Sequence, residues 1–152
     1  DCQEAERCYS QSLELFRRID DKAGQASCMA DLGYLVCRKG DRLLAASLYQ
    51  ESLVLFGELG DRRGIVRGLE GFALLAATGN RPEASLQLAA ATEMLRENLR
   101  MPGALSPQRE MMKRVIDGHR EQMGNEAHRL WTTGRAMTIE QAIEFALDCA
   151  AQ

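Results

Sequence analysis

Two histidines, His119 and His128, are the residues of this chain best suited to metal binding or proton transfer. They lie in a charged stretch that also contains Lys113, Asp117 and Arg120. A zinc site would need a cysteine or a carboxylate at helical spacing from each histidine, and the pair alone does not define one. We therefore predict that both histidines are solvated residues on a helix surface, and we predict no metal site.

The sequence also contains no clear motif for nucleophilic catalysis or phosphate binding. Serines such as Ser10, Ser12 and Ser52 are numerous, but none stands in a Gly-x-Ser-x-Gly turn. Glu4 and Arg7 have the spacing of a helix-surface ion pair rather than of an acid–base couple. No Gly-x-x-x-x-Gly-Lys-Ser/Thr loop is present to bind ATP. The sequence predicts a protein that is not an enzyme, with no catalytic residue and no cofactor.

The five cysteines, Cys2, Cys8, Cys28, Cys37 and Cys149, form no Cys-x-x-Cys pair, and their number is odd. Most of them stand among apolar residues on helical patterns. We interpret them as small buried side chains in a reducing compartment, which predicts a cytoplasmic location. A disulfide framework or a metal site is the alternative.

Composition places the chain among ordinary globular proteins. Its 152 residues are enough for one domain, and 45% of them are hydrophobic and 27% charged. The net charge is −3 and the basic residues are scattered, which argues against nucleic-acid binding by this segment. No apolar run is long enough for a membrane span, and no signal peptide is recognisable. Because the chain does not begin with Met, we expect it to be a fragment of a larger protein.

An internal repeat with an offset of 40 is the strongest pattern in the sequence. Cys8–Phe16 followed by Asp21–Gly24 matches Leu48–Phe56 followed by Asp61–Gly64. A weaker third copy follows at an offset of 39, in which Ala84, Leu88, Ala91, Met94 and Leu95 match Ala45, Tyr49, Ser52, Leu55 and Phe56. A repeat of this length predicts a solenoid, in which each helical unit buries its apolar face against its neighbours.

Apolar residues recur at helical spacing throughout. The predicted helices span roughly 3–19, 22–39, 42–58, 62–78 and 81–99, followed by helices at 107–123, 125–133 and from 139 onward. A loop is predicted over Met101–Pro107. Gly40-Asp41, Gly60-Asp61 and Gly79-Asn80 each combine a helix-ending glycine with a residue that can cap the next helix.

Two capping boxes are predicted, Asn80 with Glu83 and Thr138 with Gln141. The fold class expected is all-α, a right-handed α-solenoid of antiparallel helix pairs with a helical C-terminal cap. We assign residues 1–100 to the repeats and 101–152 to the cap, within a single structural domain. Trp131 is expected to pack the cap against the repeats.

The helix pair resembles the tetratricopeptide repeat. Leu32-Gly33 on the first helix and Ala45, Tyr49 and Ser52 on the second have the family's order of large, small and aromatic residues. Small residues are needed there because the two helices cross closely. The chain departs from the family by lacking its closing proline, and its period is longer than the usual one.

The longer period, together with Ala46–Gly64 and Trp131–Ile143, looks like the C-terminal regions of large bacterial regulators. These are the signal-transduction ATPases with numerous domains, including LuxR-type and maltose-regulator-like transcription factors. The resemblance implies an upstream ATPase and a DNA-binding helix-turn-helix in the parent protein. This segment would then be a non-catalytic protein–protein interaction or sensory repeat domain. A free-standing adaptor that binds a peptide in its groove is the alternative.

Resemblance to tetratricopeptide arrays also implies that the first helices line a concave binding surface. Helical projection puts Met29, Leu32 and Val36 on the core side of the first helix. The residues expected to contact a protein or peptide partner are Ser27, Asp31, Tyr34, Arg38, Arg67, Glu70, Leu74 and Thr78. Two alternatives remain, a merely solvated face and self-association through the exposed N-terminal helix.

Overall fold

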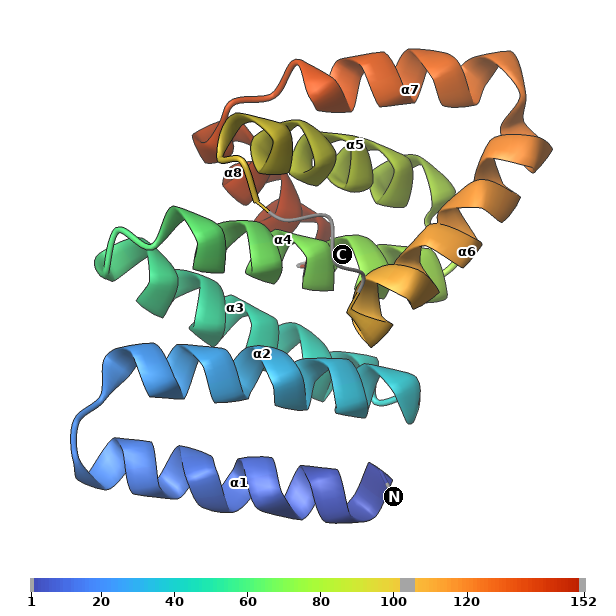
Figure 1. The fold of residues 1–152 in the computed structure, drawn as a ribbon. Helices are drawn as coiled ribbons and strands as arrows, with labels where there is room; N and C mark the ends of the chain where they lie inside the picture. Colours follow the sequence, from blue (N-terminus) through green and yellow to red (C-terminus); the bar gives the residue numbers. More distant parts are fainter. Residues whose placement is uncertain (1, 102–105, 151–152) are drawn as a thin grey trace. The chain divides into compact units, whose positions relative to one another are not determined.

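The structure, a computed structural model, describes residues 2–101 and 106–150, and all of its regular secondary structure in these ranges is helical (Figure 1). The helices are α1 (Cys2–Arg18), α2 (Lys22–Arg38), α3 (Arg42–Glu58), α4 (Arg62–Thr78), α5 (Pro82–Asn98), α6 (Pro107–Met123), α7 (Asn125–Arg135) and α8 (Ile139–Ala150). The predicted all-α class, an α-solenoid built of helix pairs, is confirmed. The predicted loop at 101–107 falls mainly on residues 102–105, outside the described residues. No helix of the described part is long and apolar enough to cross a membrane.

The first five helices repeat with great regularity. Each has 17 residues, and a three-residue connector leads to the next. One residue of each of these four connectors has a positive φ, namely Asp20, Gly40, Gly60 and Asn80, and Arg100 has one at the equivalent position after α5. This left-handed residue reverses the chain after each helix. The helix starts at 42 and 82 give the third copy an offset of 40, one more than the sequence match predicted.

The connector before α5 corrects one prediction. Asn80 does not cap α5, because it has a φ of 56° and occupies the left-handed position that Gly40 and Gly60 fill elsewhere. Asparagine tolerates this conformation better than most residues, since its short polar side chain can bond locally. The N-cap of α5 is Arg81, which makes no side-chain capping bond, and Pro82 begins the helix. The predicted capping box of Asn80 with Glu83 is therefore wrong.

The other predicted caps agree with the structure. The carboxylates of Asp41 and Asp61 accept hydrogen bonds from backbone N–H groups three residues on, at 3.1 and 3.0 Å. At α8 the N–H of Gln141 donates to the Thr138 hydroxyl (3.2 Å), and the Thr138 N–H donates to the Gln141 side chain (2.9 Å). These bonds satisfy N–H groups that would otherwise lack partners in the first turn of each helix.

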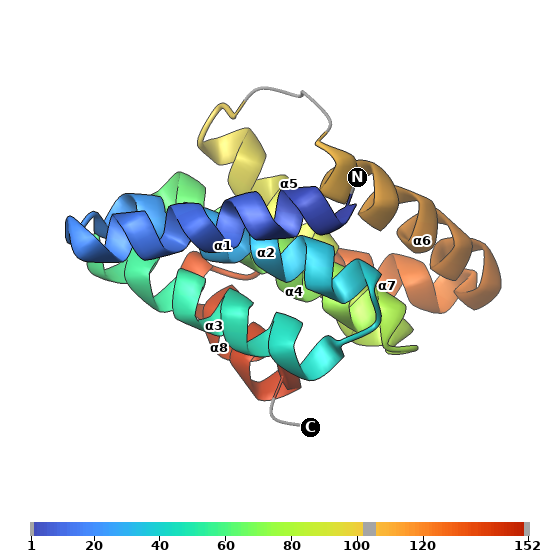
Figure 2. The ribbon, with the colours of Figure 1, turned by 90° about the horizontal axis from the view of Figure 1, so that it is seen from below.

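The chain divides into two compact units, unit 1 (Asp1–Gly68) and unit 2 (Leu69–Gln152), with the boundary inside α4. The predicted boundary between repeats and cap at residue 100, and the predicted single structural domain, stay predictions. In unit 1, α2 packs against both α1 and α3. Figure 2, seen from below, shows α1 running along α2. The buried core between these helices includes Leu13, Cys28, Met29 and Leu32.

Aromatic rings in unit 1 lie directly over glycines of neighbouring helices. A Cβ atom placed on Gly24 would lie 2.3 Å from the Phe16 ring, and one on Gly64 would lie 2.1 Å from the Phe56 ring. These two pairs are separated by the 40-residue period of the sequence. The spacing of Phe, Asp and Gly, which occurs twice in the chain, thus has a physical cause. The aspartate accepts a hydrogen bond from the third residue of the helix, and that residue must be glycine to admit the ring.

Unit 2 is organised around α5, which contacts α6, α7 and α8 (Figure 1). The closest approach to α7 is at Gly134, where a Cβ atom would lie 2.2 Å from the backbone oxygen of Gln87. Trp131, expected to pack the cap against the repeats, is half-buried, stacks with Arg120 of α6 and lines a pocket together with Ala89 of α5. At Gly134 the backbones of α7 and α5 come so close that no side chain would fit.

Replacing Gly33 tests the close contact between α2 and α3. A Cβ atom there would lie 2.9 Å from the ring of Tyr49, which is fully buried. Gly33→Leu should therefore reduce the free energy of unfolding by about 1–3 kcal/mol through overpacking. The control is Gly57→Leu, at a helical glycine with open space around it. Urea denaturation should show a loss for the first variant alone; equal midpoints would contradict the packing described.

Candidate functional site

Five of the predicted contact residues lie together in unit 1. Ser27, Asp31, Tyr34 and Arg38 follow one another on α2 at helical spacing, and Arg67 pairs with Asp31 through an ion pair. We call these five residues the α2 stripe. The Arg38 guanidinium lies 5.7 Å from the centre of the Tyr34 ring. The stripe therefore offers charged, hydroxyl and aromatic groups that are exposed or half-buried.

The charge of Asp31 affects the pKa values of two neighbouring side chains, Tyr9 and Cys28. Its negative charge, followed by burial, raises the pKa of Tyr9 on α1. Burial, followed by the charge of Asp31, raises the pKa of the Cys28 thiol. Both side chains are therefore held in their neutral forms at neutral pH. The thiol is thus buried and protonated, which makes it unsuited to nucleophilic chemistry.

The other three predicted residues, in unit 2, have different environments. Leu74 is fully buried, so its place in the predicted contact surface is wrong. Helical projection put it with the polar positions, but packing encloses that side of α4 as well. Glu70 is also buried, and it takes part in an ion-pair cluster. Thr78 is exposed, and its hydroxyl donates to the carbonyl of Leu74 at 3.0 Å.

Unit 1 also contains a surface groove that the sequence did not indicate. Its volume is about 500 Å³, and it is lined by Arg17, Gln25, Met29, Ser47, Gln50, Glu51, Val54 and Leu55. The side chain of Val54 is exposed there. An open groove with exposed apolar side chains between polar ones is a second surface to which a polypeptide could bind.

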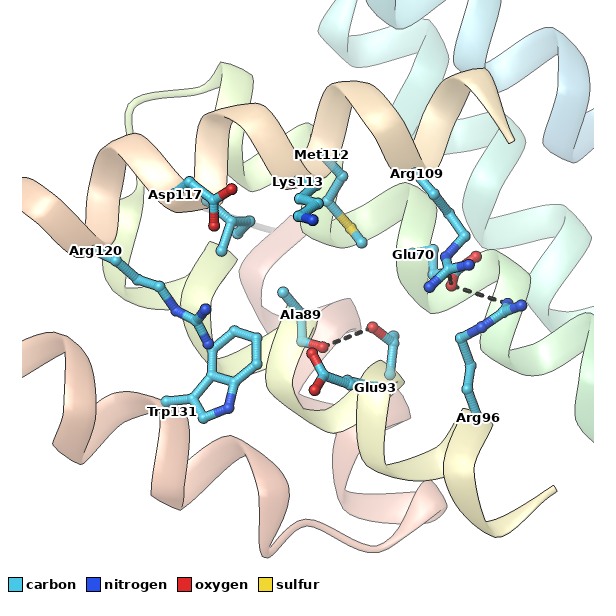
Figure 3. A pocket seen from close by; sticks show the side chains of 12 residues that line it. Glu70, Ala89, Glu93, Arg96, Arg109, Met112, Lys113, Asp117, Arg120 and Trp131 are labelled. Carbon is cyan, nitrogen blue, oxygen red and sulfur yellow. Dashed lines mark hydrogen bonds and ion pairs between the residues drawn. The ribbon is translucent and has the colours of Figure 1, made fainter. Parts of the chain in front are cut away.

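A smaller pocket lies in unit 2, between α4, α5, α6 and α7 (Figure 3). Its volume is about 130 Å³. It is lined by Glu70, Ala89, Thr92, Glu93, Arg96, Arg109, Met112, Lys113, Ile116, Asp117, Arg120 and Trp131. Four of these side chains are cationic and three are carboxylates, with apolar side chains between them.

One end of the pocket is an ion triad. A single carboxylate oxygen of Glu70, Oε1, lies 3.1 Å from Nη1 of Arg96 and 3.2 Å from Nε of Arg109. The three side chains are 5%, 13% and 20% exposed, respectively. Shielding from water strengthens these attractions, and it makes the loss of one partner expensive.

At the other end, the Arg120 guanidinium stacks on Trp131, 3.5 Å from the centre of the ring (Figure 3). Asp117 and Lys113 lie on the same side of α6. Sequence reasoning missed this pocket. The spacing of Arg109, Lys113 and Arg120 along α6 is visible in the sequence, but the helices opposite them come from distant positions.

The histidines differ from one another. His128 is exposed, as predicted. His119 is half-buried, and its Nδ1 lies 3.0 Å from the hydroxyl of Ser85, so the prediction of a fully solvated residue is wrong for it. Ser85 is buried because it lies on the packed side of α5. Within residues 2–101 and 106–150, no group of three or more His, Cys, Asp and Glu side chains could hold a metal ion.

The first 58 residues of the chain match the family model of the tetratricopeptide repeat. The match covers α1, α2 and α3, where the hydroxyl of Ser52 donates to the carbonyl of Ala26 at 2.8 Å. Ala45 and Tyr49 are fully buried there, as their small and aromatic types predicted. Comparison with curated proteins and with solved structures gave no match. The chain therefore contains a tetratricopeptide-like region, and repeats of this kind generally mediate protein–protein interaction.

Removal of the Glu70 charge tests the ion triad. Glu70→Gln would leave two shielded guanidinium groups without their shared carboxylate, so the free energy of unfolding should fall by about 3 kcal/mol. The matched control is Glu97→Gln, because Glu97 also pairs with an arginine, Arg135 at 2.8 Å, but on the exposed surface. That control should change little, since exposed ion pairs contribute little. Urea denaturation that gives equal losses for both variants would contradict the account.

Proposed function

We propose that the chain is a non-catalytic protein-interaction domain of a multidomain bacterial regulator that acts in the cytoplasm. The observation that supports it most is the match of residues 1–58 to the tetratricopeptide repeat, whose general role is to bind proteins. The resemblance of Ala46–Gly64 and Trp131–Ile143 to the C-terminal regions of LuxR-type regulators supports the proposed parent protein. In that parent, an ATPase and a DNA-binding domain would carry out transcription regulation and signal transduction.

The α2 stripe is the proposed contact surface. Its Tyr34 and Arg38 are of the two residue types that most often dominate protein interfaces. The Asp31–Arg67 pair next to them is about one-third exposed, so a partner could exchange hydrogen bonds with both charges. An extended peptide or the edge of a protein presents the mixture of backbone, apolar and charged groups that such a surface would recognise.

The alternative is that the chain belongs to a free-standing adaptor protein rather than to a multidomain regulator. It would use the same surface without an ATPase or a DNA-binding domain. Self-association is a further alternative, favoured by two exposed apolar side chains, Leu15 of α1 and Ile19 directly after it, which are 59% and 71% exposed. The complete coding sequence distinguishes the first two: a nucleotide-binding loop or a helix-turn-helix supports the regulator, and the absence of both would support the adaptor.

The contact surface can be tested in cells that express the full-length protein. A photoreactive p-benzoylphenylalanine placed at position 38 should cross-link to the partner, which mass spectrometry then identifies. The double variant Tyr34→Ala with Arg38→Glu should abolish copurification of that partner and leave the melting temperature unchanged.

The matched control for this experiment changes the groove of unit 1 through Gln50→Ala with Val54→Ser. Copurification should survive this change. If the partner is lost with the groove variant and kept with the stripe variant, the proposed surface is wrong. Cross-linking of position 38 to a second copy of the same chain would instead indicate self-association.

A further inference from the structure

We propose that the pocket of unit 2 binds a small organic carboxylate with a compact apolar body. This inference goes beyond the protein-binding role and does not depend on it, because the pocket shares no residue with the α2 stripe. Three features of the pocket carry it: the surplus of positive charge, the size of the cavity, and the presence of cationic and apolar side chains next to each other along α6.

The charge of the lining favours an anion. Four cationic side chains face three carboxylates, and one of these carboxylates, Glu93, lies 3.5 Å from Arg135, which is outside the pocket. Glu70 is shared by two guanidinium groups. A bound carboxylate would therefore bring the local charge closer to neutrality in a site partly shielded from water.

The size of the cavity favours a small molecule over a polypeptide. Its volume of about 130 Å³ is close to that of an engineered cavity of about 150 Å³ that binds benzene. Ala89, Met112 and Ile116 are buried, and together with the Trp131 ring they give the pocket its apolar surface. A planar ring or a short branched chain is of a size that such a cavity holds.

The geometry of α6 indicates where the anionic group would lie. Arg109 and Lys113 are four residues apart, so they project from the same side of the helix, and both line the pocket (Figure 3). Met112 and Ile116, also four residues apart, line the pocket beside them. A ligand lying along α6 would place its carboxylate at the two cations and its apolar body toward Trp131.

The tryptophan provides the readout, because Trp131 is the single tryptophan of the chain. Benzoate and isovalerate are the probes, with benzyl alcohol as the uncharged analogue of benzoate and inorganic phosphate as an anion without an apolar body. Binding is followed by Trp131 fluorescence and confirmed by isothermal titration calorimetry, which is insensitive to collisional quenching. We expect saturable binding of at least one carboxylate probe and no saturation by benzyl alcohol or phosphate at the same concentrations.

Two exposed neighbours on α6 supply the matched variants. Lys113→Gln removes a cation that lines the pocket, and Arg114→Gln removes one that does not. The first should weaken binding about tenfold, the loss expected for one charge-assisted hydrogen bond, and the second should leave the affinity unchanged. Failure of both carboxylates to bind would overturn the proposal, as would equal affinities for benzoate and benzyl alcohol or equal effects of the two variants.

Discussion

Phe16 and Phe56 place their rings over Gly24 and Gly64, the third residues of the helices that follow, and unit 1 is built on this contact. Each glycine also donates its N–H to the capping aspartate of its own helix. Because the same residue must accept the ring and complete the cap, its side chain can be no larger than a hydrogen atom. The direction of the next helix is thereby fixed together with its starting point.

The packing of α1, α2 and α3 determines which residues of unit 1 remain accessible to a partner. With its apolar side committed to α1 and α3, α2 leaves only a narrow row of residues for contact. Asp31 in this row forms an ion pair with Arg67 and also raises the pKa of Tyr9. The surface proposed for protein binding is therefore ordered before a partner arrives, which lowers the entropic cost of association.

Close backbone contact also occurs in unit 2, where it positions α7 next to α5. Gly134 brings α7 against α5, and Trp131, three residues earlier, is then free to face α6. The pocket arises because α6 contributes long charged side chains instead of filling the space with apolar ones. Its ion triad is a costly arrangement in terms of desolvation, and its place in the lining of this pocket supports the proposed role in recognition.

Much of the fold could be predicted from the sequence because its determinants are local. The spacing of apolar residues, the capping aspartates and the Thr138–Gln141 box act within a few positions of one another. Helix boundaries agree within two residues for this reason. The wrong assignment of Asn80 also has a local cause, since asparagine suits both a cap and a left-handed turn.

The pocket could not be predicted, because it depends on the tertiary pairing of distant helices. Glu70 and Arg96 are 26 positions apart, and nothing in their spacing shows that they meet. The burial of Leu74 has a similar origin, since a helical projection cannot show how many sides of a helix are covered. The proposed pocket therefore depends on the part of the fold that sequence patterns determine least, whereas the α2 stripe could be predicted because most of its residues follow one another along a single helix.

A double-mutant cycle on Phe56 and Gly64 tests most directly whether ring-over-glycine contact determines the packing of unit 1. The free energy of unfolding is measured for Gly64→Ala in the natural chain and in the Phe56→Ala background, which removes every ring atom that the added methyl group would meet. With the phenylalanine present, the added methyl group should cost about 1–3 kcal/mol; without it, most of that cost should disappear, which gives a coupling of about 1 kcal/mol or more. Equal costs in the two backgrounds would show that the ring does not constrain the glycine, and would contradict this explanation of the repeat.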